Sequence, residues 1–358
     1  MSLKISVTGS VPISFPGSGR GKATAFLEIL ETLGFQLSNQ MDGALLIAID
    51  HNESMYQEFL KQGGSARNAY LLRLEPKSVY PSQYRKSITE KYSRVITPGS
   101  VADSNISTIE YGWPYQYHAN PSYPKDADFD MFEALKQIGA FNFESWKSRN
   151  ILLSLVAANK VSPIGRENYS IRRKVASEIS PDILKVYGLL WTDSLFIQLK
   201  HRLSVAFFTL RQGIIPNPIS VYGSLFKKYP AAVGPTLDKH LILRNSKFSL
   251  VIENSNFYAS EKLFDVLLNQ AIPIYVGPSL QSLGLPQDLA LESNGTARDI
   301  LKAINDIDDQ GARRILLAGE AFLKSELFIE SWTEKAVYSK IANEILTCVK
   351  GGESSSST

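Results

Sequence analysis

The stretch that most constrains the fold combines two short apolar runs with an apolar helix pattern between them. Residues 248–252 have the length and the β-branched content of a buried strand. Residues 272–276 form a second such run, which a Gly-Pro pair ends. Residues 261–268 are apolar on most of a helix circumference, so this helix should be packed on several sides. The stretch therefore predicts a βαβ unit, with parallel strands joined by a right-handed crossover.

The polar side chains of this unit gather in the loop before the helix and in its first turn. Ligands of such units bind beyond the carboxyl ends of the strands. The candidate donor-binding residues there are Glu253, Asn254, Ser255, Tyr258, Ser260, Glu261 and Lys262. Ser260 is expected to cap the helix, and Lys262 beside free backbone N–H groups suits an anion such as a diphosphate. The alternative is a surface lysine, although the positive end of a helix dipole disfavours a cation.

These residues resemble the signature of the family-10 glycosyltransferases, the α1,3/α1,4-fucosyltransferases. The family pattern is roughly Lys-Phe-x-Leu-x-x-Glu-Asn-Ser, then Tyr-x-Ser/Thr-Glu-Lys-Leu, then x-Pro-x-x-x-Gly-Pro. Each element occurs in this order within residues 247–278. The resemblance implies an α/β protein of GT-B architecture, with two facing doubly wound (Rossmann-like) domains and a cleft between them. It also implies that a GDP-sugar donor binds mainly to the C-terminal domain.

The N-terminal part alternates apolar runs with helix patterns. Strands are predicted at 3–8, 44–50, 68–74 and 94–97, and helices at 22–34, 53–63 and 82–92. Such alternation predicts a parallel sheet with helices on both faces. The Gly-rich segment 17–22 is not a phosphate-binding loop, because Pro16 and Ala23 stand where that motif needs Gly and Ser or Thr.

Three ionisable residues, Asp50, His51 and Glu75, fall at predicted strand ends in this part. In the resembled family, a carboxylate in a Glu-x-Pro or Glu-Asn context of the N-terminal domain acts as the general base. Glu75-Pro76 is the closest counterpart, so the resemblance implies that Glu75 is catalytic. The alternative is a loop glutamate that caps the following helix.

The aromatic segment 111–115 supplies Trp113 and Tyr115 as acceptor-side candidates. They could form a platform for an acceptor sugar, or pack between the domains.

No metal site or cofactor is predicted. The acidic segment 126–130 lacks the glycine and the closing glutamate of a calcium loop. The four histidines show no ligand spacing, and Asp306 and Asp308 lie in a helix pattern.

The C-terminal part carries further similarity to the family, in Asn-Lys-x-Ser-Pro at 159–163 and Tyr-Ser-x-Arg-Arg at 169–173. In the family, an arginine of this helix contacts the donor diphosphate. Arg172 holds the matching place, Arg173 is its neighbour, and Arg202 is a reserve candidate. Arginine suits the role because its planar fork is bidentate and always charged.

The segment 189–245 departs from the family pattern. It contains a helix pattern at 195–212 and a second Val-Tyr-Gly sequence at 221–223, which resembles the end of another strand. We expect an insertion or a divergent connection.

The predicted domains are an acceptor-side domain at 1–145 and a GDP-sugar-binding domain at 146–330. A final helix at 331–350 is expected to return to the first domain. Residues 351–358 are rich in Gly and Ser and are expected to be disordered.

Bulk composition is that of a soluble globular protein, with 44% hydrophobic and 20% charged residues. The net charge of +3 does not indicate nucleic acid as a partner. The single cysteine, Cys348, excludes an intramolecular disulfide and favours a reducing compartment. Since no signal peptide is found and no apolar run reaches the roughly 20 residues of a membrane span, we expect a cytoplasmic protein with at most peripheral membrane association.

Together these patterns predict an inverting, metal-independent glycosyltransferase that moves fucose from GDP-fucose to a hydroxyl of a glycan acceptor. Glu75 would take the acceptor proton, while Lys262 and Arg172 would stabilise the departing GDP. One alternative is the same fold using another GDP-sugar. The other is a non-catalytic nucleotide-sugar-binding subunit of a glycan-assembly complex.

Overall fold

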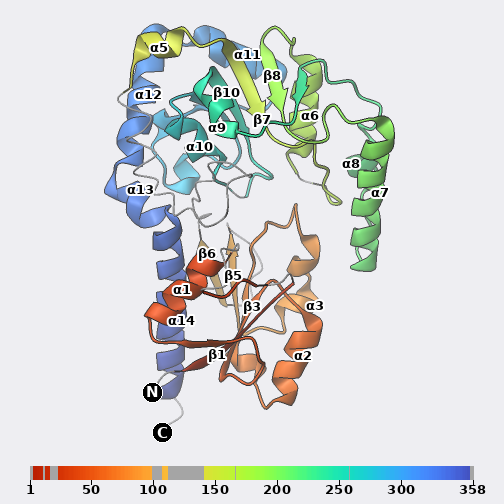
Figure 1. Ribbon diagram of the computed structural model, residues 1–358, viewed down its shortest axis with the longest axis vertical. Helices are drawn as coiled ribbons and strands as arrows, with labels where there is room; N and C mark the ends of the chain where they lie inside the picture. The colour runs from red at the N-terminus through yellow and green to blue at the C-terminus, as the bar shows by residue number, and fades with distance from the viewer. Residues whose placement is uncertain are drawn as a thin grey trace. The chain divides into compact units, whose positions relative to one another are not determined.

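The computed structural model describes residues 3–10, 13–16, 23–98, 107–111, 141–165, 167–257 and 259–354. The chain divides into two compact units (Figure 1), Met1–Tyr115 with Ile329–Thr358, and Gln116–Phe328. Within the described residues, each unit contains a six-stranded sheet whose paired strands are all parallel. The predicted α/β class with two doubly wound domains is confirmed.

The sheet of the first unit has the order β2-β1-β3-β4-β5-β6. Its strands are β1 (Lys4–Gly9), β2 (Gln36–Ser38), β3 (Leu45–Ile49), β4 (Ala69–Leu72), β5 (Arg94–Pro98) and β6 (Ser107–Tyr111). Its helices are α1 (Thr24–Thr32), α2 (Glu53–Lys61), α3 (Lys86–Thr89) and α14 (Glu334–Ser354). β2 and β6 were not predicted, because a three-residue edge strand and a strand outside any apolar run leave little periodic signal.

Alternate residues of β3 belong to two cores on opposite faces of this sheet. Ile47 and Ile49 pack with α1 and α14, whereas Leu46 and Ala48 pack with α2. Figure 1 shows α14 alongside α1 in this unit. α14 continues through Ser354, so it includes the first four residues of the segment that was expected to be disordered.

The helix predicted at 82–92 is wrong in length. A 3-10 turn at Pro81–Tyr84 and the four-residue helix α3 stand in its place. Arg85 between them has an extended backbone, with φ −72° and ψ 138°, which interrupts the helical path.

The sheet of the second unit has the order β12-β11-β10-β7-β8-β9. Its strands are β7 (Ile151–Val156), β8 (Leu184–Tyr187), β9 (Ala232–Gly234), β10 (Ser246–Ile252), β11 (Ile272–Val276) and β12 (Leu291–Glu292). The helices between and after them are α5 (Phe143–Lys147), α6 (Tyr169–Glu178), α7 (Leu195–Arg211), α8 (Pro218–Tyr222), α9 (Lys239–Arg244), α10 (Lys262–Leu268), α11 (Ala297–Asp306), α12 (Asp309–Leu323) and α13 (Glu326–Ser331).

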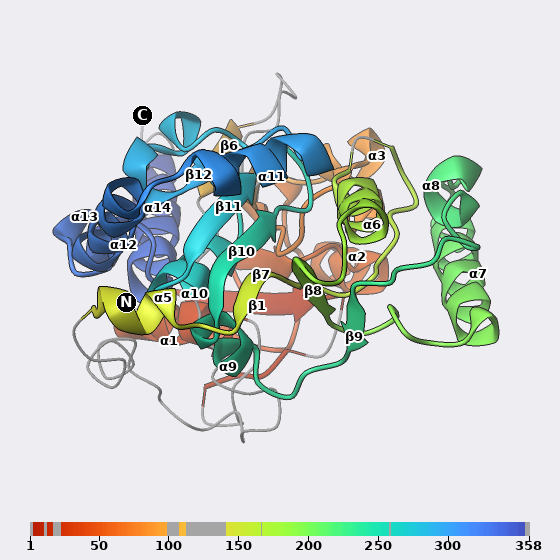
Figure 2. The same ribbon diagram turned by 90° about the horizontal axis from the view of Figure 1, so that it is seen from above.

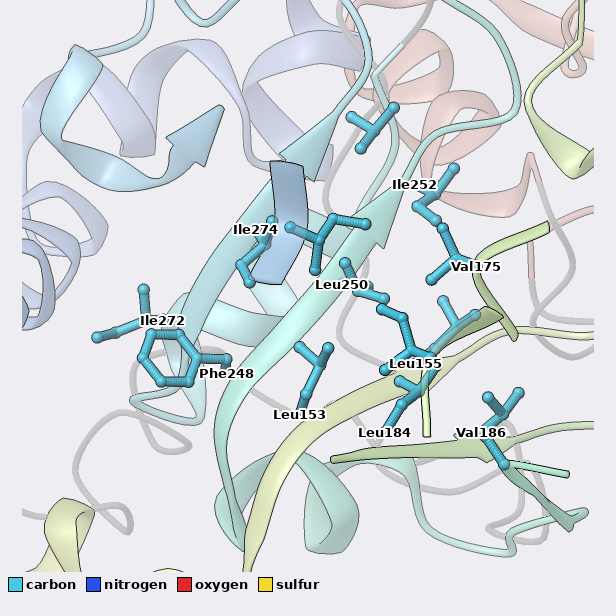
Figure 3. Packing of buried hydrophobic residues seen from close by; sticks show 14 of the residues in the cluster. Leu153, Leu155, Val175, Leu184, Val186, Phe248, Leu250, Ile252, Ile272 and Ile274 are labelled. Carbon is cyan, nitrogen blue, oxygen red and sulfur yellow. The ribbon is translucent and has the colours of Figure 1, made fainter. Parts of the chain in front are cut away.

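The predicted βαβ unit is confirmed as β10, α10 and β11, and β10 and β11 pair in parallel. Figure 3 shows Leu250 and Ile252 of β10, Leu155 of β7 and Val175 of α6 in one buried cluster. The apolar side chains of α10 are buried, as its all-round apolar pattern predicted.

One boundary and one element in the second unit differ from expectation. Phe143 and Trp146 pack in its core, so this unit includes residues before the predicted boundary after 145. The Val-Tyr-Gly sequence at 221–223 ends helix α8 and not a strand. Pro218 at the first helical position, behind the Asn217 cap, favours this helix.

Candidate functional site

Glu253 follows directly on β10 at its carboxyl end. Its backbone N–H donates to the carbonyl of Val276, the last residue of β11, across 2.8 Å. Its side chain is fully buried. The carboxylate accepts hydrogen bonds from the backbone N–H of Ser260 at 2.9 Å, from Ser260 Oγ at 2.7 Å and from Lys262 Nζ at 3.3 Å. A buried carboxylate with a cation and two further donors is well compensated for its desolvation.

Ser260 does not cap α10, which corrects the prediction. The helix begins at Lys262, and the residue before it, Glu261, makes no side-chain cap bond. The Ser260 hydroxyl donates to the Glu253 carboxylate and accepts from Lys262 Nζ at 2.6 Å. A charged acceptor makes the stronger hydrogen bond, so the hydroxyl turns to the carboxylate.

Lys262 is held by this cluster, and its side chain is only 23% exposed. A lysine ammonium has three donors. Contacts to described residues use two of them, on Glu253 and Ser260. These contacts do not fit the alternative of a surface lysine, and they leave one N–H that can reach an anion.

Arg172 on α6 ties this helix to the end of β10. Nε donates to the carbonyl of Ile252 at 3.1 Å, Nη2 donates to the same carbonyl, and Nη2 reaches Asn254 Oδ1 at 2.9 Å. Burial lowers the pKa of Arg172, while Tyr169, Glu253 and Glu167 oppose that shift. Arg172 thus fixes the loop that carries Glu253 and Asn254, and its described hydrogen bonds do not use Nη1.

The other two arginine candidates have different partners. Arg173 Nη1 donates to the carbonyl of Lys160 at 2.6 Å, and Nη2 lies 3.7 Å from Glu167 Oε1. Arg202 donates to the carbonyl of Val221 and to Ser224 Oγ, which fastens α7 to the α8 segment. Of the three, only Arg172 has a described hydrogen bond to the loop that begins at Glu253.

Three residues near this loop escaped the sequence analysis. Asn168 donates through Nδ2 to Asn256 Oδ1 at 2.8 Å and through its backbone N–H to the Asn254 carbonyl at 3.1 Å. The buried hydroxyl of Tyr275 has no hydrogen-bond partner among the described residues, and burial raises its pKa. The sequence feature that could have pointed to Tyr275 is its hydroxyl group, which lies in an otherwise apolar strand.

Gly277 is the third of them, and the space beside it requires glycine. A Cβ there would lie 2.7 Å from the Tyr275 hydroxyl oxygen and 2.9 Å from Cγ of Glu253. Both distances are shorter than real Cβ contacts allow. The sequence analysis gave the Gly-Pro pair as a strand stop and as part of the family pattern, but it did not predict that the glycine makes room for the Glu253 side chain.

The structure brings together Arg172, Glu253, Asn254, Ser260 and Lys262. Ser255 is buried in the same loop, and Glu261 stands before α10. Tyr258, Trp113 and Tyr115 lie outside the described residues.

Glu75 lies in the first unit, three residues beyond β4, and is partly exposed. Its loop is pinned at two points: the Tyr84 hydroxyl donates to the Glu75 carbonyl at 3.0 Å, and Asp50 Oδ1 accepts from the Leu74 N–H at 3.2 Å. Asp50 has a positive φ of 56°, which Asp tolerates better than most residues. Tyr80 precedes the next turn, and its side chain makes no cap bond there.

The described residues contain no group of three or more His, Cys, Asp and Glu side chains arranged to hold a metal ion. Among the helices in the described ranges, none is both long and apolar enough to cross a membrane.

Comparison with known proteins gives similarity in structure only. No protein-family model matches the chain, and no curated protein matches its sequence. The Anabaena protein HepE in complex with UDP and glucose matches with TM-score 0.51 and 12% identity, over 96% of this chain and 100% of that chain. An α,α-trehalose 6-phosphate synthase from Burkholderia multivorans matches with TM-score 0.50 and 8% identity, over 100% of this chain and 99% of that one. An α1,3-fucosyltransferase with GDP-fucose matches with TM-score 0.49 and 12% identity, over 98% of this chain and 90% of that chain.

The likeness to HepE and to the trehalose 6-phosphate synthase extends over nearly all of each chain. With the two parallel sheets, it shows that this chain has the two-domain, Rossmann-like fold of the GT-B type.

Proposed function

We propose that this chain is a glycosyltransferase that uses a nucleoside diphosphate sugar. The donor is GDP-fucose, and the acceptor is a hydroxyl of a glycan. The observation that carries the proposal is the cluster of Glu253, Ser260 and Lys262 at the carboxyl end of β10, the place where Rossmann-like folds bind nucleotides.

The cluster suits the departure of a nucleoside diphosphate. Glu253 and Ser260 hold the ammonium of Lys262 in place, with one N–H left for a phosphate oxygen. A cation held in advance stabilises the charge that develops on the leaving group without reorganising during the reaction. Arg172 supplies a second positive charge beside the same loop, in a buried and fixed orientation.

The proposed reaction is a single displacement with inversion at the anomeric carbon. The acceptor oxygen forms a bond to that carbon, and the bond to the β-phosphate oxygen breaks, so GDP leaves with the electron pair. Glu75 takes the acceptor proton, and general-base help of this kind contributes about 10²–10⁴ in rate. Lys262 and Arg172 balance the charge on GDP, so the proposal needs no divalent cation.

Support for GDP-fucose comes from the sequence pattern in 247–278. A rival donor is UDP-glucose, because the structure of HepE contains UDP and glucose. A second rival is a subunit that binds a nucleotide sugar without turnover.

The deciding experiment is calorimetry with GDP-fucose, GDP and UDP-glucose in the presence of EDTA, followed by transfer assays on a glycan panel. The proposal expects binding of both guanine compounds without metal, and transfer of fucose. Tight binding of UDP-glucose alone would favour the first rival, and donor binding without transfer to any acceptor would favour the second.

Lys262→Met should weaken GDP binding by about tenfold to a hundredfold, which corresponds to one hydrogen bond to a charged group. Lys174→Met, an exposed lysine on α6, is the matched control.

A further inference from the structure

Helix α7 presents its large apolar side chains outward and buries polar ones. Its buried residues include Arg202 and Thr209. Phe196, Leu203, Phe207 and Leu210 each leave between 51% and 74% of their surface exposed. Residues spaced by three, four and seven positions share one face of a helix, so these four form one stripe. Contiguous exposed apolar surface of this kind marks an interaction site.

The sequence around the stripe carries only positive charge. From residue 194 to residue 237 the sequence contains no Asp or Glu, while the basic residues are Lys200, Arg202, Arg211, Lys227 and Lys228. All of these except Arg202 are exposed. Lys200 falls on the face of the stripe, and the guanidinium carbon of Arg211 lies 4.4 Å from the ring centre of Phe207.

The segment after α7 also exposes large apolar side chains. Ile215, Ile219 and Phe226 are each more than 80% exposed. Arg202, through Val221 and Ser224, fastens this segment to α7. Figures 1 and 2 show α8 beside α7, with both helices set to one side of the second sheet.

We propose that the α7–α8 segment, residues 194–228, docks the protein on an anionic lipid surface. The phenylalanine and leucine side chains enter the boundary between headgroups and acyl chains, and Lys200 and Arg211 stay at the level of the lipid phosphates. Charge decides between a membrane and a second copy of this chain. Pairing two α7–α8 segments would bring like charges together, which costs free energy, whereas anionic lipid attracts them. The proposal does not depend on the donor or the reaction proposed above.

The test is co-sedimentation of the full chain with vesicles of phosphatidylcholine, alone or mixed with phosphatidylglycerol. We expect binding to the mixed vesicles that weakens as salt rises, and little binding to phosphatidylcholine alone. Phe207→Glu should lower the partition coefficient about tenfold or more, since it removes a ring that would insert into the lipid and adds an acid. Lys200→Glu with Arg211→Glu should lower it by about fivefold for each cation removed, before any added repulsion.

The matched controls are Leu317→Glu on α12, where leucine is 54% exposed, and Lys174→Glu on α6. Both should bind vesicles as the wild type does. The urea unfolding midpoint of each variant shows whether it is folded. If Phe207→Glu does not fold, the variant with Lys200→Glu and Arg211→Glu still tests the proposal. Absence of wild-type binding to mixed vesicles overturns the proposal, as does equal binding by wild type and both α7 variants. A dimer in sedimentation velocity that Phe207→Glu dissociates, without vesicle binding, would assign the surface to a second copy of the chain.

Discussion

Lys262 and Glu253 form an ion pair across 3.3 Å, and the carboxylate of Glu253 is fully buried. The two residues lie at the two ends of the loop that joins β10 to α10: Glu253 follows β10, and Lys262 begins α10. Removing either partner leaves the other without its counter-charge, and that is costly when the remaining charge is buried. The same pair therefore stabilises the loop and holds the cation that we assign to the donor.

A double-mutant cycle of Lys262→Met and Glu253→Gln measures this pair. Each single change should lower the free energy of unfolding, and the double variant should lose less than the sum, with a coupling free energy of about 1–3 kcal/mol. Urea unfolding provides the values. Losses that add to within about 0.5 kcal/mol would show that the two groups act independently.

Gly277→Ala should disturb the cluster of Glu253, Ser260 and Lys262 through the Glu253 side chain. The added Cβ meets the Tyr275 hydroxyl oxygen at 2.7 Å and Glu253 Cγ at 2.9 Å, so the Glu253 side chain must move. We expect a destabilisation of about 1–3 kcal/mol and weaker GDP binding, measured by urea unfolding and calorimetry. Gly165→Ala is the control, because its nearest neighbour would be 3.8 Å away. Wild-type stability and affinity in Gly277→Ala would contradict the described packing.

Arg172→Lys and Arg173→Lys separate two neighbouring arginines. Lysine keeps the charge but loses the planar fork, so both changes should destabilise the fold. Only Arg172→Lys should also lower GDP affinity, by about tenfold or more, because Arg172 fixes the Glu253–Asn254 loop. Calorimetry on both variants checks this. The reverse pattern would assign the diphosphate contact to Arg173.

Glu75→Gln should separate transfer from donor binding. The amide cannot accept the acceptor proton, so transfer should fall by about two orders of magnitude while GDP-fucose affinity stays near that of the wild type. Asp50→Asn is the control, since an amide oxygen can still accept from the Leu74 N–H. Equal loss of binding and transfer in Glu75→Gln would make Glu75 a donor ligand or a structural residue. Loss of transfer in Asp50→Asn alone would move the base to Asp50.

The sequence predicted those parts of the fold that depend on neighbours along the chain. β10, α10 and β11 follow from run length and apolar pattern alone, and the bounds of β11 match the prediction at both ends. β2 and β6 were missed because these edge strands form by pairing with one neighbouring strand and not from a periodic apolar pattern of their own.

In the candidate site, too, the features set by nearby residues were predicted and those set by contacts in the folded protein were not. The residues of the 253–262 loop were found from the pattern, but the role of Ser260 was not. Helix capping is a local preference, whereas the Glu253 carboxylate reaches Ser260 only through the folded loop. Gly277 likewise depends on contacts with Tyr275 and Glu253, which no local pattern records.

The most direct test of the central claim is calorimetric titration of the wild type with GDP-fucose in EDTA, beside Lys262→Met. The account predicts binding to the wild type without metal, with affinity about tenfold to a hundredfold lower for Lys262→Met while the variant remains folded. Absence of binding to the folded wild type, or equal affinity of the two proteins, would contradict the assignment of this cluster to the donor diphosphate.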